Sequence, residues 1–411
     1  MRVVVVGAGF AGLIAADRIT RSGQQVVVLE ARNRVGGRVW SERLIPGDER
    51  TVIERGAEFV LDGYEVMRSV LAELGLELAD TAMSYYTREP RGGEPVSIAE
   101  VARCAERIEA AAGAASPGTS LADLLADLLA DGLRDELPAA ALAAYVSRVT
   151  ITNGVSAAEL SVAELADVTS GFEARPCWRV AGGNGVLAHR LAERLGGALW
   201  LNSAVRAISH DAAGVRVLTS SGSVSADAVI VAVPMAVLRG LVFDPPLPAG
   251  YYQAWRRAGI AHNAKLHVPL TEPAAASAVL SVPGVFWTWT ATDGSGQVQP
   301  VLHAFGGTAE GLAALGIAGG PSAWARQAAA LRPELALDLD RALLTTWNDD
   351  PWAGESYSAL TTSVAYGDDS LIATPCGRVH FAGEHTAFDW TGLMEGALRS
   401  GVRAADEVLA R

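Results

Sequence analysis

The sequence predicts an α/β fold: a doubly wound parallel sheet with an inserted α+β domain. Two apolar runs, residues 2–6 and 26–29, predict the sheet, because they have the composition of strands buried on both faces. The first run leads into a G-x-G-x-x-G pattern over residues 7–12 and then a helix-like stretch, and the second run ends in Glu30. The insertion is predicted because residues 65–175 change to an alanine-rich helical composition.

Strand, glycine turn, helix, strand and terminal acid together are typical of a dinucleotide-binding unit. Gly7 permits the tight turn, Gly9 lets the backbone approach a pyrophosphate, and Gly12 allows the helix to pack closely on the strand. The helix N-terminus would face the phosphates, and Glu30 would accept hydrogen bonds from the adenosine ribose. An ordinary glycine-rich turn is the alternative for the pattern alone. The predicted contacts of this turn also include Phe10 and Ala11.

The composition describes a well-packed globular chain of 411 residues, 50% of them apolar and 19% charged. This length predicts two interleaved domains. A net charge of −13 argues against a nucleic-acid or anionic-membrane surface, and no window has the ~18 apolar residues of a membrane span. Three cysteines without a C-x-x-C pattern, and a first strand that leaves no room for a leader, predict a cytoplasmic protein with free thiols.

A second glycine motif follows the first unit. Ala31 and Arg32 lead to the pair Gly36 and Gly37 ahead of Arg38, so that backbone amides and a guanidinium can meet one phosphate or flavin edge. A solvated surface turn is the alternative. With the opening turn, these residues resemble the start of the flavin-containing amine oxidase family, which includes monoamine, polyamine and nicotine-type oxidases and is related to L-amino-acid oxidases. The resemblance implies a Rossmann-like domain that binds FAD rather than NAD.

The resemblance extends along the chain and implies further cofactor contacts. The last helix would direct its N-terminus at the flavin, where its partial positive charge stabilises an anionic reduced ring. The implied contacts are Ala57, Glu58, Phe59 and Trp352 around the flavin ring, the backbone of Val205 at the adenine, Gly383 and Glu384 at the ribityl chain or pyrophosphate, and Leu393 and Met394 at the start of the last helix.

Lys265 and Tyr357 are the predicted catalytic residues. Lys265 interrupts an apolar strand at 264–269, where a buried charge is costly unless it has a use; an exposed position on an edge strand is the alternative. The resemblance implies that Lys265 holds a water near flavin N5 and assists reoxidation by oxygen. It also implies that Tyr357 is one of two aromatic side chains that clamp the amine over the flavin.

Two positions depart from the family pattern around the flavin. The second clamp position holds Leu393, so that Trp352 and Trp390 are the candidates to replace the missing ring. Ser356 stands where mitochondrial-type monoamine oxidases carry the cysteine that binds flavin covalently. The resemblance therefore implies non-covalent FAD.

A third departure concerns the substrate. The arginine that grips a carboxylate in L-amino-acid oxidases is missing after Gly56, where Glu58 and Asp62 instead favour a cationic substrate. A structural role for Glu58 is an equal alternative. The predicted strand at 286–289 places two tryptophans on one face, for which core packing is the first interpretation and a pocket wall the second.

We therefore predict FAD-dependent oxidation of an amine to an imine, which hydrolyses to a carbonyl, with O2 reduced to H2O2. The alternatives are an L-amino-acid oxidase, a desaturase-like flavin oxidase and, from another class, a flavoprotein scaffold without turnover. The predicted partners are a small amine and O2, with a homodimer as one option for assembly, and no nucleic acid or membrane. The histidines lack the i, i+4 spacing of a helical metal pair, so no metal is expected.

The predicted FAD-binding domain comprises residues 1–65, 176–244 and 360–411, and the substrate domain residues 66–175 and 245–359.

Overall fold

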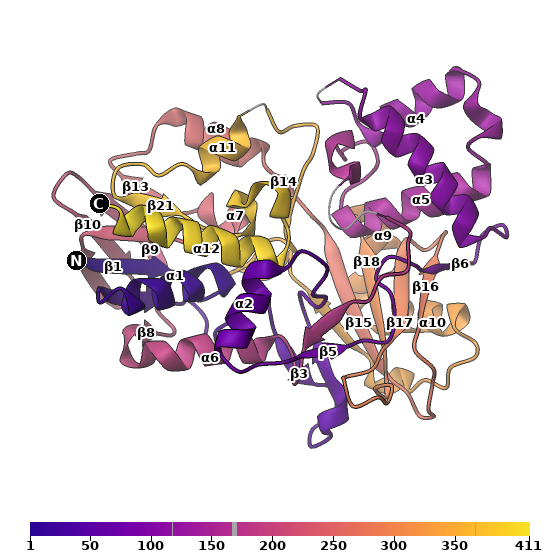
Figure 1. The fold of residues 1–411 in the computed structure, drawn as a ribbon, viewed down its shortest axis with the longest axis horizontal. Helices are drawn as coiled ribbons and strands as arrows, with labels where there is room; N and C mark the ends of the chain where they lie inside the picture. The colour runs from indigo at the N-terminus through magenta and orange to yellow at the C-terminus, as the bar shows by residue number, and fades with distance from the viewer. Residues whose placement is uncertain (117, 167–170, 366) are drawn as a thin grey trace.

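The computed structural model describes residues 1–116, 118–166, 171–365 and 367–411, which form two regions side by side in Figure 1. The first region is built on a five-stranded sheet with the order β21-β12-β1-β2-β8, in which all paired neighbours are parallel. The predicted parallel sheet is thus confirmed, with the N-terminal strand at its centre. Its strands are β1 (Arg2–Val6), β2 (Gln25–Leu29), β8 (Leu199–Trp200), β12 (Ala228–Val231) and β21 (Val379–Phe381).

One face of this sheet is covered by α1 (Phe10–Arg21), α6 (Gly185–Leu195) and α12 (Met394–Leu409), as Figure 1 shows. The helix α12 packs tightly along α1 because Gly401 has no side chain; a Cβ there would lie 2.2 Å from the carbonyl oxygen of Ala11. The valines of β1 alternate between this core and a second core on the opposite face. The central strand is therefore buried on both sides, as its continuous apolar run predicts.

The opposite face carries a four-stranded sheet and three short helices. The helix α8 contributes Tyr251 and Trp255 to the core there, and both rings contact Phe381 of β21. The predicted boundary at residue 245 placed α8 in the substrate domain, whereas this packing assigns it to the first region. These elements are β9 (Val205–His210), β10 (Val215–Thr219), β11 (Gly222–Ala226), β13 (Val242–Asp244), α7 (Met235–Leu238), α8 (Ala249–Arg257) and α11 (Asp368–Ala373).

The second region is built on a six-stranded sheet with the order β19-β15-β18-β17-β16-β6. Its neighbours are antiparallel except for β16 and β6. The helices α9 and α10 cover one face, where Trp324 contacts Phe286. These elements are β6 (Glu89–Arg91), β15 (Asn263–Pro269), β16 (Ser277–Ser281), β17 (Phe286–Thr290), β18 (Val301–Gly307), β19 (Leu343–Thr346), α9 (Ala309–Ala314) and α10 (Ser322–Leu331).

The alanine-rich insertion forms a helical group at the top of the second region in Figure 1. It comprises α3 (Ile98–Ala112), α4 (Leu121–Ala130) and α5 (Ala139–Asn153). Ser97 and Glu100 form a capping box at the start of α3, and the Ser120 hydroxyl caps α4. The end of α5 reaches the six-stranded sheet and brings this group to the site described below.

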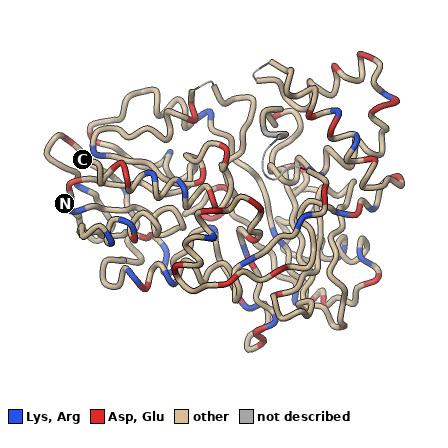
Figure 2. The backbone as a smooth tube through the Cα atoms, viewed as in Figure 1, with Lys and Arg blue, Asp and Glu red and all other residues tan. Residues whose placement is uncertain are grey.

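The remaining elements connect the two regions. They are α2 (Glu65–Glu73), β3 (Ser41–Arg43), β4 (Val52–Glu54), β5 (Leu78–Asp80), β7 (Trp178–Val180), β14 (Gly259–Ile260) and β20 (Ser358–Ala359). Acidic and basic positions are interspersed over both regions, as Figure 2 shows. Within the described part of the chain, no helix has the length and apolar character needed to cross a membrane.

Candidate functional site

One cavity extends from the first sheet to the second. Its lining comes from the β1–α1 turn, the end of β2, the start of α12 and the strands β15, β17 and β18. The carboxyl ends of β1 and β2 therefore open into it, which is where open parallel sheets bind ligands. Every predicted site residue except Gly12 and Trp390 lines this cavity: Gly7, Gly9, Phe10, Ala11, Glu30, Ala31, Arg32, Gly36, Gly37, Arg38, Ala57, Glu58, Phe59, Val205, Lys265, Trp352, Tyr357, Gly383, Glu384, Leu393 and Met394.

The glycines of the first turn differ in what an added side chain would meet. Gly7 has a φ of +102°, and a Cβ on it would lie 2.7 Å from the carbonyl oxygen of Ala232. A Cβ on Gly12 would lie 2.0 Å from the carbonyl oxygen of Gly7, so Gly12 is needed for packing rather than for lining the cavity. A Cβ on Gly9 would meet nothing within 4 Å. The backbone at Gly9 is thus open to a ligand, which fits a pyrophosphate.

Glu30 is held in place by backbone amides. Its carboxylate accepts hydrogen bonds from the amide of Ala8, at 2.7 Å, and from that of Arg32, at 2.9 Å. Each carboxylate oxygen has a further lone pair, so Glu30 can also accept from two ribose hydroxyls. The Arg32 side chain forms a bidentate ion pair with Asp350, with a shortest distance of 2.7 Å. Arg32 therefore fixes this corner of the cavity through Asp350.

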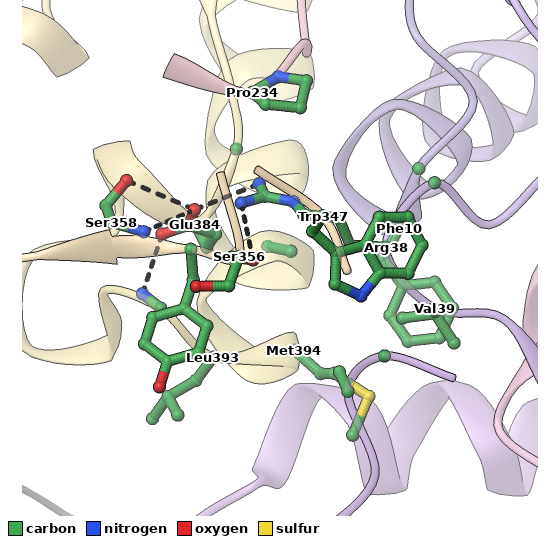
Figure 3. A pocket seen from close by; sticks show the side chains of 18 of the residues that line it. Phe10, Arg38, Val39, Pro234, Trp347, Ser356, Ser358, Glu384, Leu393 and Met394 are labelled. Atoms are coloured by element: carbon green, nitrogen blue, oxygen red, sulfur yellow. Dashed lines mark hydrogen bonds and ion pairs between the residues drawn. The ribbon is translucent and has the colours of Figure 1, made fainter. Parts of the chain in front are cut away.

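Arg38 joins the two ends of the chain at the centre of the cavity. Its guanidinium lies 3.0 Å from Glu384 and 3.2 Å from Glu355, and it donates to the carbonyl oxygen of Ser356 at 3.1 Å. In Figure 3 dashed lines join the guanidinium of Arg38 to the carboxylate of Glu384. Glu384 also accepts hydrogen bonds from the amide of Gly392, at 2.8 Å, and from Ser358. The Glu384 carboxylate thus holds Arg38, Gly392 and Ser358 in place beside the predicted cofactor site.

Glu355 was not among the predicted site residues. Burial raises the pKa of its carboxyl to about 7, although Arg38 and the amides of Met235 and Ala236 oppose this change. These two amides belong to the first turn of α7, where the helix dipole favours a carboxylate. In the sequence, Glu355 stands out only as the acid directly before Ser356. Its partners lie more than one hundred residues away, so its role could not be inferred from neighbouring residues.

Lys265 is buried in the centre of β15 and does not occupy the alternative edge position. Its Nζ atom donates to the carbonyl oxygen of Gly56, at 3.0 Å, and forms an ion pair with Glu58, at 2.5 Å. The same carboxylate is 3.4 Å from Arg179 and 3.3 Å from the indole nitrogen of Trp289. Burial alone would raise the pKa of Glu58, but Lys265 and Arg179 hold it below its ordinary value. Glu58 is thus an ionised structural carboxylate that lines the cavity.

This pairing removes the electrostatic argument for a cationic substrate. The negative charge of Glu58 is compensated by Lys265 and Arg179, and Asp62 is exposed and lies outside the cavity lining. Arg179 is buried behind Glu58 and also donates to the Thr292 carbonyl, at 2.9 Å. Its position on β7 could not be paired with Glu58 from the sequence, because the two are 121 residues apart.

Aromatic side chains enclose the end of the cavity in the second region. Trp287 and Trp289 stack at 4.2 Å between ring centroids, and Phe59 lies within 6 Å of both. Both tryptophans line the cavity, so the pocket wall is the correct interpretation of this strand. Tyr85 lies 5.9 Å from Trp287 and lines the cavity as well.

Tyr357 and Leu393 lie at the junction between the cofactor end and the aromatic end. The Tyr357 hydroxyl donates to the carbonyl oxygen of Thr152 at the end of α5, at 2.5 Å. Leu393 directly precedes α12 and lies near Met394 in Figure 3. Ser356 donates its hydroxyl proton towards Ala261 and Asn263, both at 2.8 Å. Position 356 thus has a hydrogen-bonding role here and no thiol.

Neither tryptophan candidate is shown to replace the second clamp ring. Trp390 packs against Tyr64, at 5.8 Å between ring centroids, and against the guanidinium of Arg399, and it does not line the cavity. It therefore belongs to the contact between α2 and α12. Trp352 lines the cavity but is 39% exposed and follows Asp350, the partner of Arg32. Its place is on the dinucleotide side.

The residues around the cavity suit a dinucleotide. No group of three or more potential metal ligands was found among the residues that the structure describes. The open backbone at Gly9, the amide-held Glu30 and the start of α12 together fit a dinucleotide whose reactive end meets the aromatic walls.

Comparisons with known proteins agree with this geometry. Residues 10–409 match the model of the family described as flavin containing amine oxidoreductase. The chain is 32% identical to a protein of Mycobacterium tuberculosis that bears the name of a flavin-containing monoamine oxidase, over 99% of this chain and 96% of the other. It is 27% identical to an L-amino-acid oxidase of Mus musculus, over 98% of this chain and 70% of the other.

Solved structures show the same fold. A putrescine oxidase bound to putrescine superposes with a TM-score of 0.82 at 23% identity, and the match covers all of both chains. Cyclohexylamine oxidase from Brevibacterium oxydans superposes with a TM-score of 0.78 at 21% identity, covering 100% of this chain and 99% of the other.

Proposed function

Because the chain belongs to the family of flavin-containing amine oxidoreductases, we propose that it uses bound FAD to oxidise an amine to an imine, with O2 as the electron acceptor. It is an oxidoreductase that acts on amines, and its family uses a flavin. One observation carries the specific proposal. The first glycine turn with Glu30 and the aromatic walls line one continuous cavity, and Lys265 and Tyr357 line it as well.

When bound, FAD would supply the redox chemistry: a hydride equivalent leaves the α-carbon and a proton leaves the nitrogen of the amine, and these two electrons and two protons together reduce O2 to H2O2, while water hydrolyses the imine to a carbonyl. The protein contributes binding, orientation and electrostatics. Glu30 and the backbone at Gly9 would hold the adenosine and pyrophosphate. The start of α12 would place free amides and a partial positive charge at the reactive end, where they stabilise negative charge.

The aromatic walls would orient a neutral amine and exclude water. Tyr357 is held by the Thr152 carbonyl, so its ring cannot turn away from the cavity without losing that hydrogen bond. Phe59, Trp287 and Trp289 give the amine an apolar surface on the other side. No separate side chain is needed as a general base in this arrangement.

Lys265 would assist reoxidation by holding a water. The hydrogen bonds to Gly56 and Glu58 use two of the three N–H groups of the ammonium. Because Lys265 lines the cavity, its third N–H can hold a water there and place positive charge where oxygen is reduced. This role for Lys265 follows the family resemblance and is supported by its burial and by its ion pair with Glu58.

Two alternative substrate classes stay open. An L-amino-acid oxidase remains the second candidate, since a relative bears that name and the acids near Gly56 no longer argue against a carboxylate. A desaturase-like oxidase is the third.

We also propose that FAD is bound non-covalently, because Ser356 provides no thiol, and that the protein works in the cytoplasm, where its unpaired cysteines would stay reduced. A homodimer is proposed as one assembly.

The test is anaerobic reduction of the FAD-loaded protein by a panel of monoamines, diamines, cyclic secondary amines and amino acids. Bleaching of the flavin absorbance by an amine, followed by peroxide release on addition of oxygen, is the expected result. Reduction by amino acids alone would select the second candidate. A flavin that no member of the panel reduces would reject the proposal.

A further inference from the structure

Two buried arginines lie behind the aromatic end of the cavity without a carboxylate partner. Arg88 and Arg148 are each 5% exposed, and neither forms an ion pair with any residue that the structure describes. Arg88 donates from Nε to the Tyr85 carbonyl, at 3.2 Å, and Arg148 donates to the Gly171 carbonyl, at 2.5 Å. On each side chain one terminal nitrogen is buried and has no hydrogen-bond partner. Burial of a cation in this way is costly, so its retention calls for a use.

Both arginines are next to the cavity wall. The guanidinium carbon of Arg88 lies 4.0 Å from the ring centroid of Trp287 and 4.8 Å from that of Tyr85, and both rings line the cavity. Arg148 lies one turn of α5 before Thr152, which lines the cavity and accepts the hydrogen bond of Tyr357. One turn corresponds to about 5.4 Å along the helix. Neither arginine lines the cavity itself, so each acts through the wall.

The two groups place positive charge without an ion-pair partner among the described residues at this end of the cavity. Burial lowers the pKa of Arg148 to about 9, with Arg88 as the next cause, so the two charges are close enough to affect each other. A pKa of about 9 leaves Arg148 cationic at neutral pH. The Glu109 carboxylate raises the pKa of Arg148, but by less than Tyr85 and Tyr145 do. Burial also lowers the pKa of Arg88.

The other charges along the cavity are compensated. Lys265 and Arg179 share Glu58, Arg38 has two carboxylates, and Arg32 has Asp350. Among the described residues, by contrast, no carboxylate forms an ion pair with Arg88 or Arg148, and Glu109 acts on Arg148 less strongly than Arg88 does. Because the rings of Trp287 and Tyr85 stand between Arg88 and the cavity, the electrostatic potential of the buried guanidinium extends through a weakly polar wall into the cavity.

We propose that Arg88 and Arg148 determine substrate specificity by charge: they disfavour an amine with a second cationic group and favour an amine with a carboxylate at its far end. The inference rests on the proposed amine oxidation and adds a substrate class to it. The reactive amine would lie between Tyr357 and the cofactor, and the far end would point towards Trp287 and Tyr85. An ω-amino acid fits this charge distribution best, a simple monoamine is acceptable, and a diamine is disfavoured.

The test uses three amines of equal length that differ only at the far end: pentylamine, 1,4-diaminobutane and 5-aminopentanoate. A second set with two more methylenes, heptylamine, 1,6-diaminohexane and 7-aminoheptanoate, covers a deeper reach. The rate constant for anaerobic flavin reduction divided by the dissociation constant is measured for each at neutral pH. The carboxylate should exceed the diamine by at least about tenfold, with the alkylamine between them. A diamine that equals or exceeds its matched alkylamine in both sets would overturn the proposal.

Arg88→Met and Arg148→Met test the assignment to these residues. In each variant the ratio of the carboxylate to the diamine should fall by about tenfold or more, towards one. Arg107→Met is the matched control, because Arg107 is a surface residue of α3 paired with Glu136, and it should keep the wild-type ratio. An unchanged ratio in both buried variants would overturn the proposal. If a methionine variant does not fold, the ratio in Arg88→Lys and Arg148→Lys, which keep the charge and should keep the preference, takes its place.

A binding measurement separates this proposal from the proposed function. Calorimetric titration of the FAD-loaded protein with hexanoate and with hexanamide compares a charged and a neutral far end without any turnover. Tighter binding of hexanoate, lost in the methionine variants, supports the charge assignment. Equal binding of the two compounds contradicts it. If no amine reduces the flavin while hexanoate still binds more tightly, the oxidase function fails and the anion preference stands.

Discussion

The Lys265 ammonium and the Glu58 carboxylate form an ion pair with 2.5 Å between Nζ and Oε2, and both side chains are at most 5% exposed. One end of the pair lies on the second sheet and the other follows β4 of the connecting elements. The pair therefore joins the two regions at the cavity wall. Because each charge has lost its hydration, each depends on the other.

The first prediction concerns stability. Glu58→Gln should lower the free energy of unfolding by roughly 3–5 kcal/mol, because Lys265 and Arg179 are left buried without an anion. The double variant Glu58→Gln/Lys265→Met should lose less than the single one, since one orphaned cation is removed. Urea unfolding at neutral pH measures both. Glu49→Gln, at an exposed ion pair with Arg43, is the control and should change stability by no more than about 1 kcal/mol.

The second prediction concerns Lys265 in turnover. Lys265→Met should slow reoxidation of the reduced flavin by oxygen by roughly a hundredfold, because the positive charge at the site of oxygen reduction is removed. Anaerobic reduction by an amine should slow far less. Stopped-flow absorbance separates the two half-reactions. Equal slowing of both would show that Lys265 maintains the cavity rather than the reaction with oxygen.

The third prediction concerns the adenosine end. Glu30→Ala should weaken FAD binding by about tenfold to a hundredfold. The substitution removes the carboxylate that would accept two hydrogen bonds from the ribose, and it also removes the hydrogen bonds that hold the amides of Ala8 and Arg32 in place. The absorbance spectrum of the FAD that remains bound should not change, since the reactive ring lies elsewhere. Titration of the flavin-free protein with FAD gives the dissociation constant. Full retention of FAD after dialysis would count against the assigned contact.

The fourth prediction concerns flavin attachment. Because Ser356 offers a hydroxyl that is held by Ala261 and Asn263, acid precipitation should release all FAD into the supernatant. The intact mass of the denatured chain should equal the mass of the sequence. A yellow precipitate, or an added mass of one flavin, would show covalent attachment at another residue.

The fifth prediction concerns pH. Burial raises the pKa of Glu54 from its ordinary 4.5 to about 7, against hydrogen bonds from the Asn184 amide and the Ser41 hydroxyl. The folded chain thus holds a proton between about pH 4.5 and 7 that the unfolded chain has released, and the free energy of unfolding falls as the pH rises through this window. Glu54→Gln should remove this decrease, which amounts to up to about 3 kcal/mol over the whole window.

Urea unfolding at several pH values between 5 and 8 tests this expectation. The slope of the wild-type protein should exceed that of Glu54→Gln, whereas Glu49→Gln, which alters an exposed carboxyl, should keep the wild-type slope. Parallel curves for wild type and Glu54→Gln would mean that another group accounts for the pH dependence.

Local sequence was sufficient where one short segment determines the structure. The β1–α1 turn follows from Gly7, Gly9 and Gly12, because the backbone conformation and the close contacts are set by neighbours in sequence. The parallel sheet follows from apolar runs of the right length. Lys265 could be singled out because a lysine in an apolar strand is conspicuous.

Long-range pairing could not be read in the same way. The alternation of Trp287 and Trp289 shows that they share a face, but not that the face opens onto a cavity. Trp390 was a reasonable ring candidate by its distance from Leu393, yet it turns towards Tyr64. The charges of Arg88 and Arg148 can be interpreted only once the structure shows that neither arginine forms an ion pair with a described residue.

The packing of α12 on α1 also has a consequence for biosynthesis. During synthesis β1 and α1 are made hundreds of residues before the neighbours that complete their site, β21 and α12. A ribosome-bound chain therefore carries an incomplete nucleotide cradle whose apolar surfaces stay uncovered until residues 379–409 have emerged. Cofactor loading must follow translation of this segment, and the stretch of synthesis before it is the period when the chain depends most on chaperones.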